Sequence, residues 1–201
     1  MSTNTTSVWR KKLKELEIVV VIPTYNNGKT LAAVIEEVCR YADDIIVVND
    51  GSTDDTANIL EQYPAIRTIT HPVNKGKGTA LKHGLSQAKK EGFRYAITID
   101  SDGQHFASDI PCFIEAIEKE PDTLLVGARN LASDNMPGKN TFANKFSNFW
   151  FRLETGLKLE DTQSGYRLYP LRKLDVQSCW YTAIYELELE AIVFAAWGDV
   201  V

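Results

Sequence analysis

Two aspartates, Asp100 and Asp102, lie two residues apart directly after a short apolar run. Alternate side chains of an extended backbone share a face, so both carboxylates can point at one ligand. Carboxylate and diphosphate oxygens are the ligands that Mg²⁺ and Mn²⁺ prefer, which makes this D-x-D triplet a candidate metal site. Aspartate and glycine also favour turns after a strand, so the triplet alone is a weak signal.

Polar residues follow two other apolar runs. Asp50 and Gly51 end one of them, where an acid can bind a base or a ribose while glycine lets the ligand approach the backbone. Residues 23–28 end another, and offer Tyr25 for stacking and amides beside the start of a helix, which suit a base and a phosphate. A plain turn explains the segment at Asp50 equally well when it is judged alone.

Residues 72–94 carry six basic side chains against one acidic one. Within them, Lys77 lies in a Gly-Lys-Gly-Thr loop that matches neither a Walker motif nor a dinucleotide fingerprint. A basic glycine loop that opens a helix still suits an anion such as a nucleotide diphosphate or a lipid headgroup. A solvated helix face is the alternative. The lone histidines nearby, His71 and His83, are more typical of structural groups than of ligands.

Two arginines further along, Arg129 and Arg167, can clamp a phosphate through the planar guanidinium, although surface ion pairs would also explain them. Four aromatic residues recur at helical spacing and indicate either a core face or a surface for the acceptor or a membrane: Phe142, Phe146, Phe149 and Trp150.

The elements that must position these residues alternate along the chain. Apolar runs predict strands at 18–22, 45–48, 66–70, 95–99 and 123–126, and helical spacing follows most of them, including 79–90 and 110–117. This order predicts an α/β fold, with an open, mostly parallel sheet and helices on both faces. In such sheets the ligand lies beyond the carboxyl ends of the strands.

Composition narrows the class of protein. The 201 residues are 44% hydrophobic and 24% charged with a net charge of −5, which is typical of one folded domain and argues against nucleic acid as a partner. Three cysteines without a pairing pattern indicate reduced, buried thiols in a cytoplasmic protein: Cys39, Cys112 and Cys179. We expect neither a secretory signal nor a membrane span.

Six motifs occur in a fixed order: V-V-V-I-P-T-Y-N-N, I-V-V-N-D-G-S-T-D-D-T, N-K-G-K-G-T-A-L-K-H-G, I-D-S-D-G-Q-H, V-G-A-R and D-T-Q-S-G-Y-R. The series resembles the family 2 glycosyltransferases of the GT-A fold, especially the dolichyl- or polyprenyl-phosphate mannosyl- and glucosyltransferase branch. The resemblance covers about residues 17–197. It implies a GT-A domain over 17–201 that is truncated at its C-terminus, preceded by a basic extension over 1–16.

The resemblance also implies roles for individual residues. Asp100, Asp102 and Gln104 match the metal and diphosphate group, Arg129 matches the residue that binds the acceptor's phosphate, and Arg167 lies in the acceptor-side motif. Where relatives carry glutamate after Tyr-Asn, this chain has Asn27. Together with the basic loop, these matches predict a nucleotide-sugar site formed by six residues: Pro23, Tyr25, Asn27, Asp50, Lys77 and Asp100.

We therefore predict an inverting, metal-dependent transfer of a hexose from a UDP or GDP sugar to a lipid phosphate or glycan acceptor, at the inner face of a membrane. Asp102 and Arg129 are the predicted catalytic residues. A lipid phosphate needs no general base, whereas a hydroxyl acceptor needs one, for which Asp161 is the first candidate and Glu188 the second. Two alternatives are a non-catalytic nucleotide-sugar-binding fragment and a haloacid-dehalogenase-type phosphohydrolase, to whose signature I-D-S-D-G is similar.

Overall fold

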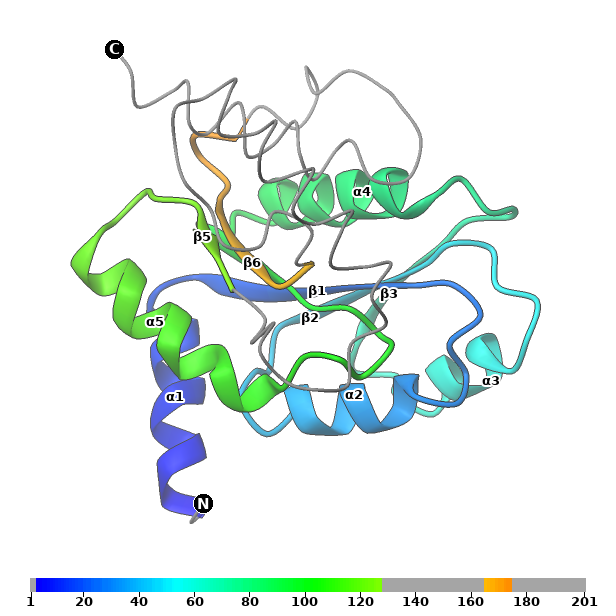
Figure 1. The fold of residues 1–201 in the computed structure, drawn as a ribbon, viewed down its shortest axis with the longest axis horizontal. Helices are drawn as coiled ribbons and strands as arrows, with labels where there is room; N and C mark the ends of the chain where they lie inside the picture. The colour runs from blue at the N-terminus through cyan, green and yellow to red at the C-terminus, as the bar shows by residue number, and fades with distance from the viewer. Residues whose placement is uncertain (1–2, 128–164, 175–201) are drawn as a thin grey trace, which may run out of the picture.

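Helices cover both faces of a six-stranded sheet in the part of the chain that the computed structural model describes, residues 3–127 and 165–174 (Figure 1). The strand order is β3-β2-β1-β4-β6-β5. Four strands are parallel: β1 (Ile18–Thr24), β2 (Ile45–Asn49), β3 (Arg67–Thr70) and β4 (Tyr95–Thr98). β6 (Arg167–Pro170) is antiparallel to β4 and to β5 (Leu125–Val126). The predicted open, mostly parallel α/β sheet is confirmed.

The alternation of side chains along β1 divides the core into two layers. Val20 and Ile22 pack in the layer that contains residues of α2 (Leu31–Val38) and α5 (Ile110–Lys119). Val19 and Val21 pack in the layer beneath α4 (Lys77–Lys90). All seven residues of β1 are buried, as the continuous β-branched run predicts for a strand covered on both faces. Figure 1 shows α4 on one face of the sheet and α1, α2, α3 (Thr56–Glu61) and α5 on the other.

The chain changes direction across the sheet between β3 and β4. β2 and β3 extend the sheet on one side of β1, whereas β4 pairs with the opposite edge of β1. The carboxyl ends of β1, β2 and β4 therefore meet where the strand order reverses. This is the position at which open α/β sheets bind ligands.

Residues 1–16, which the sequence analysis gives only as a basic extension, contain α1 (Thr3–Glu15). Leu13 is buried in the core and Trp9 packs against it. Lys12 joins α1 to α5 through an ion pair of 2.7 Å with Glu118. The apolar positions on its buried side are Trp9, Leu13 and, just after the helix, Leu16, spaced four and three apart among basic residues. The apolar stripe is therefore only one residue wide, which is a weak helix signal.

One strand goes beyond the predicted elements, and one expectation is corrected. The apolar pattern predicts no strand over β6, because a four-residue segment that begins with arginine and ends with proline carries little strand signal. Cys112 is exposed rather than buried, because α5 buries Ile110, Phe113 and Ile114 and leaves Cys112 on its outer side. Cys39 is partly buried, which raises the pKa of its thiol, and Cys179 lies outside the described residues.

Among residues 3–127 and 165–174, no helix has both the length and the apolar character needed to cross a bilayer.

Gly84 is the point where α4 approaches the sheet most tightly. A Cβ atom built there would lie 2.5 Å from Val21 Cγ1 and 3.1 Å from Val48 Cγ2. Both are β-branched side chains with little rotamer freedom in a buried layer. We expect Gly84→Ala to lower the free energy of unfolding by about 1–3 kcal/mol through overpacking, despite the better helix propensity of alanine. Urea denaturation measures this, with Ser86→Ala on the same helix as the control; an unchanged or stabilised Gly84→Ala protein would contradict the packing.

Candidate active site

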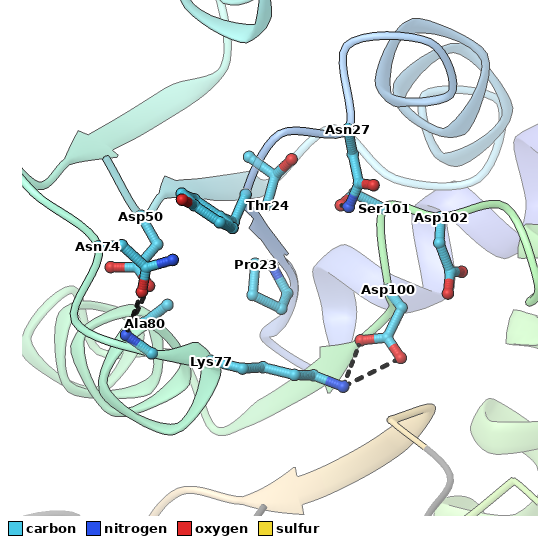
Figure 2. Close-up of a pocket in the computed structure, with 12 residues that line it drawn as sticks. Pro23, Thr24, Asn27, Asp50, Asn74, Lys77, Ala80, Asp100, Ser101 and Asp102 are labelled. Carbon is cyan, nitrogen blue, oxygen red and sulfur yellow. Dashed lines mark hydrogen bonds and ion pairs between the residues drawn. The ribbon is translucent and has the colours of Figure 1, made fainter. Parts of the chain in front are cut away.

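A pocket of about 390 Å³ opens at the reversal point of the sheet (Figure 2). Its walls come from the ends of β1, β2 and β4 and from the start of α4. Twelve residues line it: Pro23, Thr24, Tyr25, Asn27, Asp50, Asn74, Gly76, Lys77, Ala80, Asp100, Ser101 and Asp102. All six residues of the predicted nucleotide-sugar site and the predicted catalytic Asp102 are therefore brought together here.

The segment after β1 supports the D-x-D loop as well as lining the pocket. Asn27 Nδ2 donates to Ser101 Oγ at 2.8 Å, and Thr30 Oγ1 donates to Ser101 O at 2.6 Å. Ser101 stands between the two aspartates, so these bonds fix the backbone from which both carboxylates project. Tyr25 is 43% exposed at the same edge, which leaves its ring open to a flat partner.

Asp50 lies buried at the end of β2, and most of its hydrogen-bonding capacity is used by the protein. Oδ1 accepts from His71 Nδ1 at 2.6 Å and from the Lys75 N–H at 2.9 Å, while Oδ2 accepts from the Gly76 N–H at 2.8 Å. An ionised carboxylate offers about four acceptor positions, so about one remains for a ligand. Asp50 thus holds a loop as well as facing the pocket.

Gly51 lets the β2 loop and the β3 loop touch. Its φ is +71°, and a Cβ atom there would lie 2.4 Å from the carbonyl carbon of Val73 and 2.5 Å from the Asn74 nitrogen. Neither backbone atom can move aside as a side chain would. This contact brings Lys75 and Gly76 within reach of Asp50.

Lys77 and Asp100 face each other across the pocket, as Figure 2 shows. Lys77 Nζ lies 2.9 Å from Oδ1 and 3.1 Å from Oδ2 of Asp100. His105 Nε2 lies 3.9 Å from Oδ2. The Asp100 carboxylate therefore pairs with the Lys77 ammonium in this structure. It is an anionic oxygen group of the kind that a divalent metal ion prefers as a ligand.

Asp102 is exposed and projects from the same loop. Its Oδ1 accepts the Gln104 N–H at 2.9 Å, a local turn contact. Gln104, a predicted metal ligand, is also exposed and lies outside the pocket lining. In the described part of the chain no three His, Cys, Asp or Glu side chains cluster to hold a metal. Two carboxylates fit a divalent cation whose remaining ligands come from a diphosphate and water.

Gly165 is a further residue of this site, and the motif pattern does not single it out. A Cβ atom at position 165 would lie 2.3 Å from Asp100 Oδ2, so the backbone before β6 approaches this carboxylate too closely to leave room for a side chain. The Gly165 carbonyl accepts from Thr98 Oγ1 at 2.7 Å, which holds it against β4. In the sequence, Gly165 is only a glycine in a polar turn, where glycine is common whatever the turn lies against.

Arg167 occupies a buried position in β6 rather than the pocket wall. Its side chain is fully buried, and Nη1 donates to Tyr169 Oη at 3.4 Å. Its assignment to the acceptor stays a prediction. Three other predicted residues lie outside the described residues, as do the aromatic residues at 142–150: Arg129, Asp161 and Glu188.

The fold and the pocket define the class: an α/β protein whose charged ligand site lies at the switch point of its sheet. The family model described as "Glycosyl transferase family 2" matches residues 19–174, and the chain belongs to this family. The match favours the glycosyltransferase interpretation of the D-x-D motif over the phosphohydrolase one.

Similar proteins include enzymes named for lipid phosphates. The chain is 32% identical to the UDP-N-acetylglucosamine–dolichyl-phosphate N-acetylglucosaminyltransferase of Methanococcus voltae, covering 89% of this chain and 79% of that protein. It is 28% identical to a dolichyl-phosphate beta-glucosyltransferase of Trichomonas vaginalis, covering 74% of this chain. The chain spans only about half of that relative, 52%.

Among solved structures, the glucosyl-3-phosphoglycerate synthase of Mycobacterium tuberculosis superposes with a TM-score of 0.68 at 22% identity. The match covers 94% of this chain and 67% of the synthase. That protein was crystallised with Mn²⁺, UDP-glucose and phosphoglyceric acid. The similarity confirms the GT-A fold expected from the sequence.

His83 lies on α4 and contacts His71. Its protonation makes the folding stability of the protein depend on pH. His83 is exposed as a residue, but partial desolvation of its ring lowers its pKa, as do the neighbouring charges of His71, Lys75 and Lys82, while Asp50 opposes the shift. Below the ordinary histidine pKa of about 6.5, the unfolded chain therefore binds this proton more readily than the folded one. Stability is lost as the pH falls from about 6.5 towards the lower pKa of the folded state.

We expect His83→Gln to lose less stability than the wild type between pH 7 and pH 5, measured by urea denaturation at each pH. Gln87→Ala, one helical turn further along α4, is the control and should follow the wild type. Parallel pH curves for the wild type and His83→Gln would show that this proton is not linked to folding.

Proposed function

We propose that this protein is a metal-dependent, inverting hexosyltransferase that moves a sugar from a nucleotide diphosphate to a lipid-linked phosphate. The observation that carries the proposal is the meeting of Lys77, Asp100 and Asp102 in one pocket at the switch point of the sheet. A basic group and two carboxylates at this position suit a diphosphate and its counter-cation. The family of the chain supplies the reaction class.

The donor's nucleoside would lie at the β1 and β2 side of the pocket. Tyr25 offers an exposed aromatic face for the base, beside Pro23. The remaining acceptor position of Asp50 suits a ribose hydroxyl or a base N–H. Among UDP and GDP donors, the Methanococcus voltae relative named for a UDP sugar favours UDP.

The diphosphate would lie between Lys77 and the D-x-D loop. Asp100 and Asp102, with Gln104 after them, are the residues that would hold Mg²⁺ or Mn²⁺. A divalent ion there offsets the charge that develops on the leaving diphosphate, an effect of roughly several kcal/mol. Lys77, released from Asp100, would then face the diphosphate oxygens.

The acceptor is an anion under this proposal, and Arg129 would orient its phosphate, with Arg167 on the acceptor side. A phosphate oxygen attacks the anomeric carbon while the bond from that carbon to the diphosphate oxygen breaks, and the diphosphate leaves with the electron pair. Attack from the face opposite the leaving group inverts the anomeric configuration. An ionised phosphate gives up no proton, so a base such as Asp161 is required only for a hydroxyl acceptor.

The relatives named for dolichyl and polyprenol phosphates support a lipid acceptor, and with it peripheral contact of a cytoplasmic protein with the inner face of a membrane.

Asp102→Asn tests the role of the carboxylate pair. The amide keeps the shape of the side chain but removes its charge, so we expect kcat to fall by at least about 100-fold and metal-dependent binding of UDP to weaken. Transfer to a short polyprenyl phosphate and calorimetry with Mn²⁺ provide the two readouts.

Glu120→Gln removes one negative charge at the exposed end of α5 and is the matched control, with wild-type activity expected. Wild-type turnover by Asp102→Asn in the presence of a chelator would refute the metal assignment. Donor binding by the wild type without any turnover would instead favour the non-catalytic alternative.

Arg129→Ala tests the side of the site on which the acceptor binds. If Arg129 binds the acceptor's phosphate, the KM for polyprenyl phosphate should rise by about tenfold or more, because a charge-assisted hydrogen bond is lost. The Kd for UDP should stay at the wild-type value. Equal losses in UDP binding and in transfer would move Arg129 to the donor side.

A further inference from the structure

The side chains of Asp50, His71 and His83 contact one another in sequence, from the pocket to the surface of α4. His71 follows β3, and its backbone N–H donates to the Asn49 carbonyl at 2.9 Å, which extends the pairing of β3 with β2. This register places the imidazole beside Asp50 at the carboxyl edge of the sheet. The two residues are only 4% and 2% exposed. His71 does not line the pocket itself, but it contacts Asp50, which does.

The imidazole of His71 is held at both ends. Nδ1–H donates to Asp50 Oδ1 at 2.6 Å, and Nε2 lies 2.7 Å from His83 Nδ1. The two rings are perpendicular, with their centroids 4.7 Å apart. Both distances lie at the short end of the range for hydrogen bonds, and the bond to Asp50 is charge-assisted. The orientation of the His71 ring is therefore fixed between a buried carboxylate and an exposed residue of α4.

Asp50 in turn fixes the start of α4. The residue just before this helix, at its N-cap position, is Gly76, which has no side chain with which to cap the N–H groups of the first turn. Asp50 holds the segment that leads into the helix from another strand, because its oxygens accept the N–H groups of Lys75 and Gly76, the latter shared with Asn74 Oδ1 at 2.8 Å. The next residue is Lys77, whose ammonium reaches Asp100. By holding the backbone of Lys75 and Gly76, the Asp50 carboxylate helps to fix the position from which the Lys77 side chain projects.

We propose that His71 and His83 are positioning residues for the nucleotide donor, an inference that rests on the proposed function. His71 holds Asp50 in the orientation that leaves one acceptor position for the nucleoside and that places Lys77 for the diphosphate. His83 holds the ring of His71 from the outside. Neither imidazole lines the pocket, so neither is a catalytic residue.

This role differs from simple packing in what it does to the kinetics. Loss of the hydrogen bond to Asp50 disturbs the nucleotide side of the pocket, whereas the D-x-D loop is held separately by Asn27 and Thr30. The donor KM and the nucleotide Kd should therefore rise, while kcat and the acceptor KM stay near the wild-type values.

The test compares His71→Leu, which has no donor, with His71→Asn, whose amide places an N–H about where Nδ1 lies. We expect His71→Leu to raise the donor KM and the Kd for UDP with Mn²⁺ by about tenfold or more, as the loss of a hydrogen bond to a charged group predicts. His71→Asn should recover most of this loss. His83→Ala, which leaves the Asp50 bond in place but frees the ring, should give a smaller rise of about threefold.

Thermal midpoints verify that each variant is folded, and Gln87→Ala on α4 is the control, expected to bind UDP as the wild type does. His83 is exposed, so His83→Ala decides the matter if His71→Leu does not fold. UDP binding unchanged in the folded variants, or His71→Asn as weak as His71→Leu, would overturn the positioning role. A fall in kcat with an unchanged donor KM would overturn it as well.

The wild type is titrated first with UDP and with GDP. Binding of neither nucleotide overturns the proposed function and this inference together. Binding by the wild type with no difference in the variants overturns the inference alone.

Discussion

The buried carboxylate of Asp50 is the interaction on which the geometry of the pocket depends. A charge removed from water is tolerated only when it is paired and hydrogen-bonded, and the three donors to Asp50 come from the turn after β3 and from the start of α4. The satisfaction of one charge therefore joins β2, β3 and α4. Gly51 permits this junction, because any side chain there would collide with the backbone of the neighbouring loop.

The acidic side of the pocket is built on a different principle, close approach of backbone. Gly165, just before β6, lies against Asp100, and hydrogen bonds from Asn27 and Thr30, in the segment after β1, hold Ser101. The D-x-D loop is thereby confined between an antiparallel strand that comes late in the chain and a loop that comes early. Both sides of the site draw on the same feature of the fold, the reversal of strand order beside β1.

The parallel half of the fold could be predicted from the sequence because its signal is local. The run that forms β1 is continuously β-branched, and the glycine and aspartate that follow β2 mark its end. By contrast, β6 and the contact of Gly165 with Asp100 arise from pairing with a strand about 70 residues away, which no local pattern reveals. The sequence favours a structural role for each histidine alone, since His71 and His83 are twelve residues apart and only the packing of α4 brings them into contact.

The ion pair between Lys77 and Asp100 has a consequence for the order of events at the site. A divalent ion that takes the Asp100 oxygens must compete with an ammonium group already 2.9 Å away. Under the proposed function, metal uptake would be an exchange of one cation for another, and its cost would fall when an incoming diphosphate gives the displaced lysine a new anion to face. Such coupling would make the ion and the donor enter cooperatively, so the protein without its donor would bind little free metal.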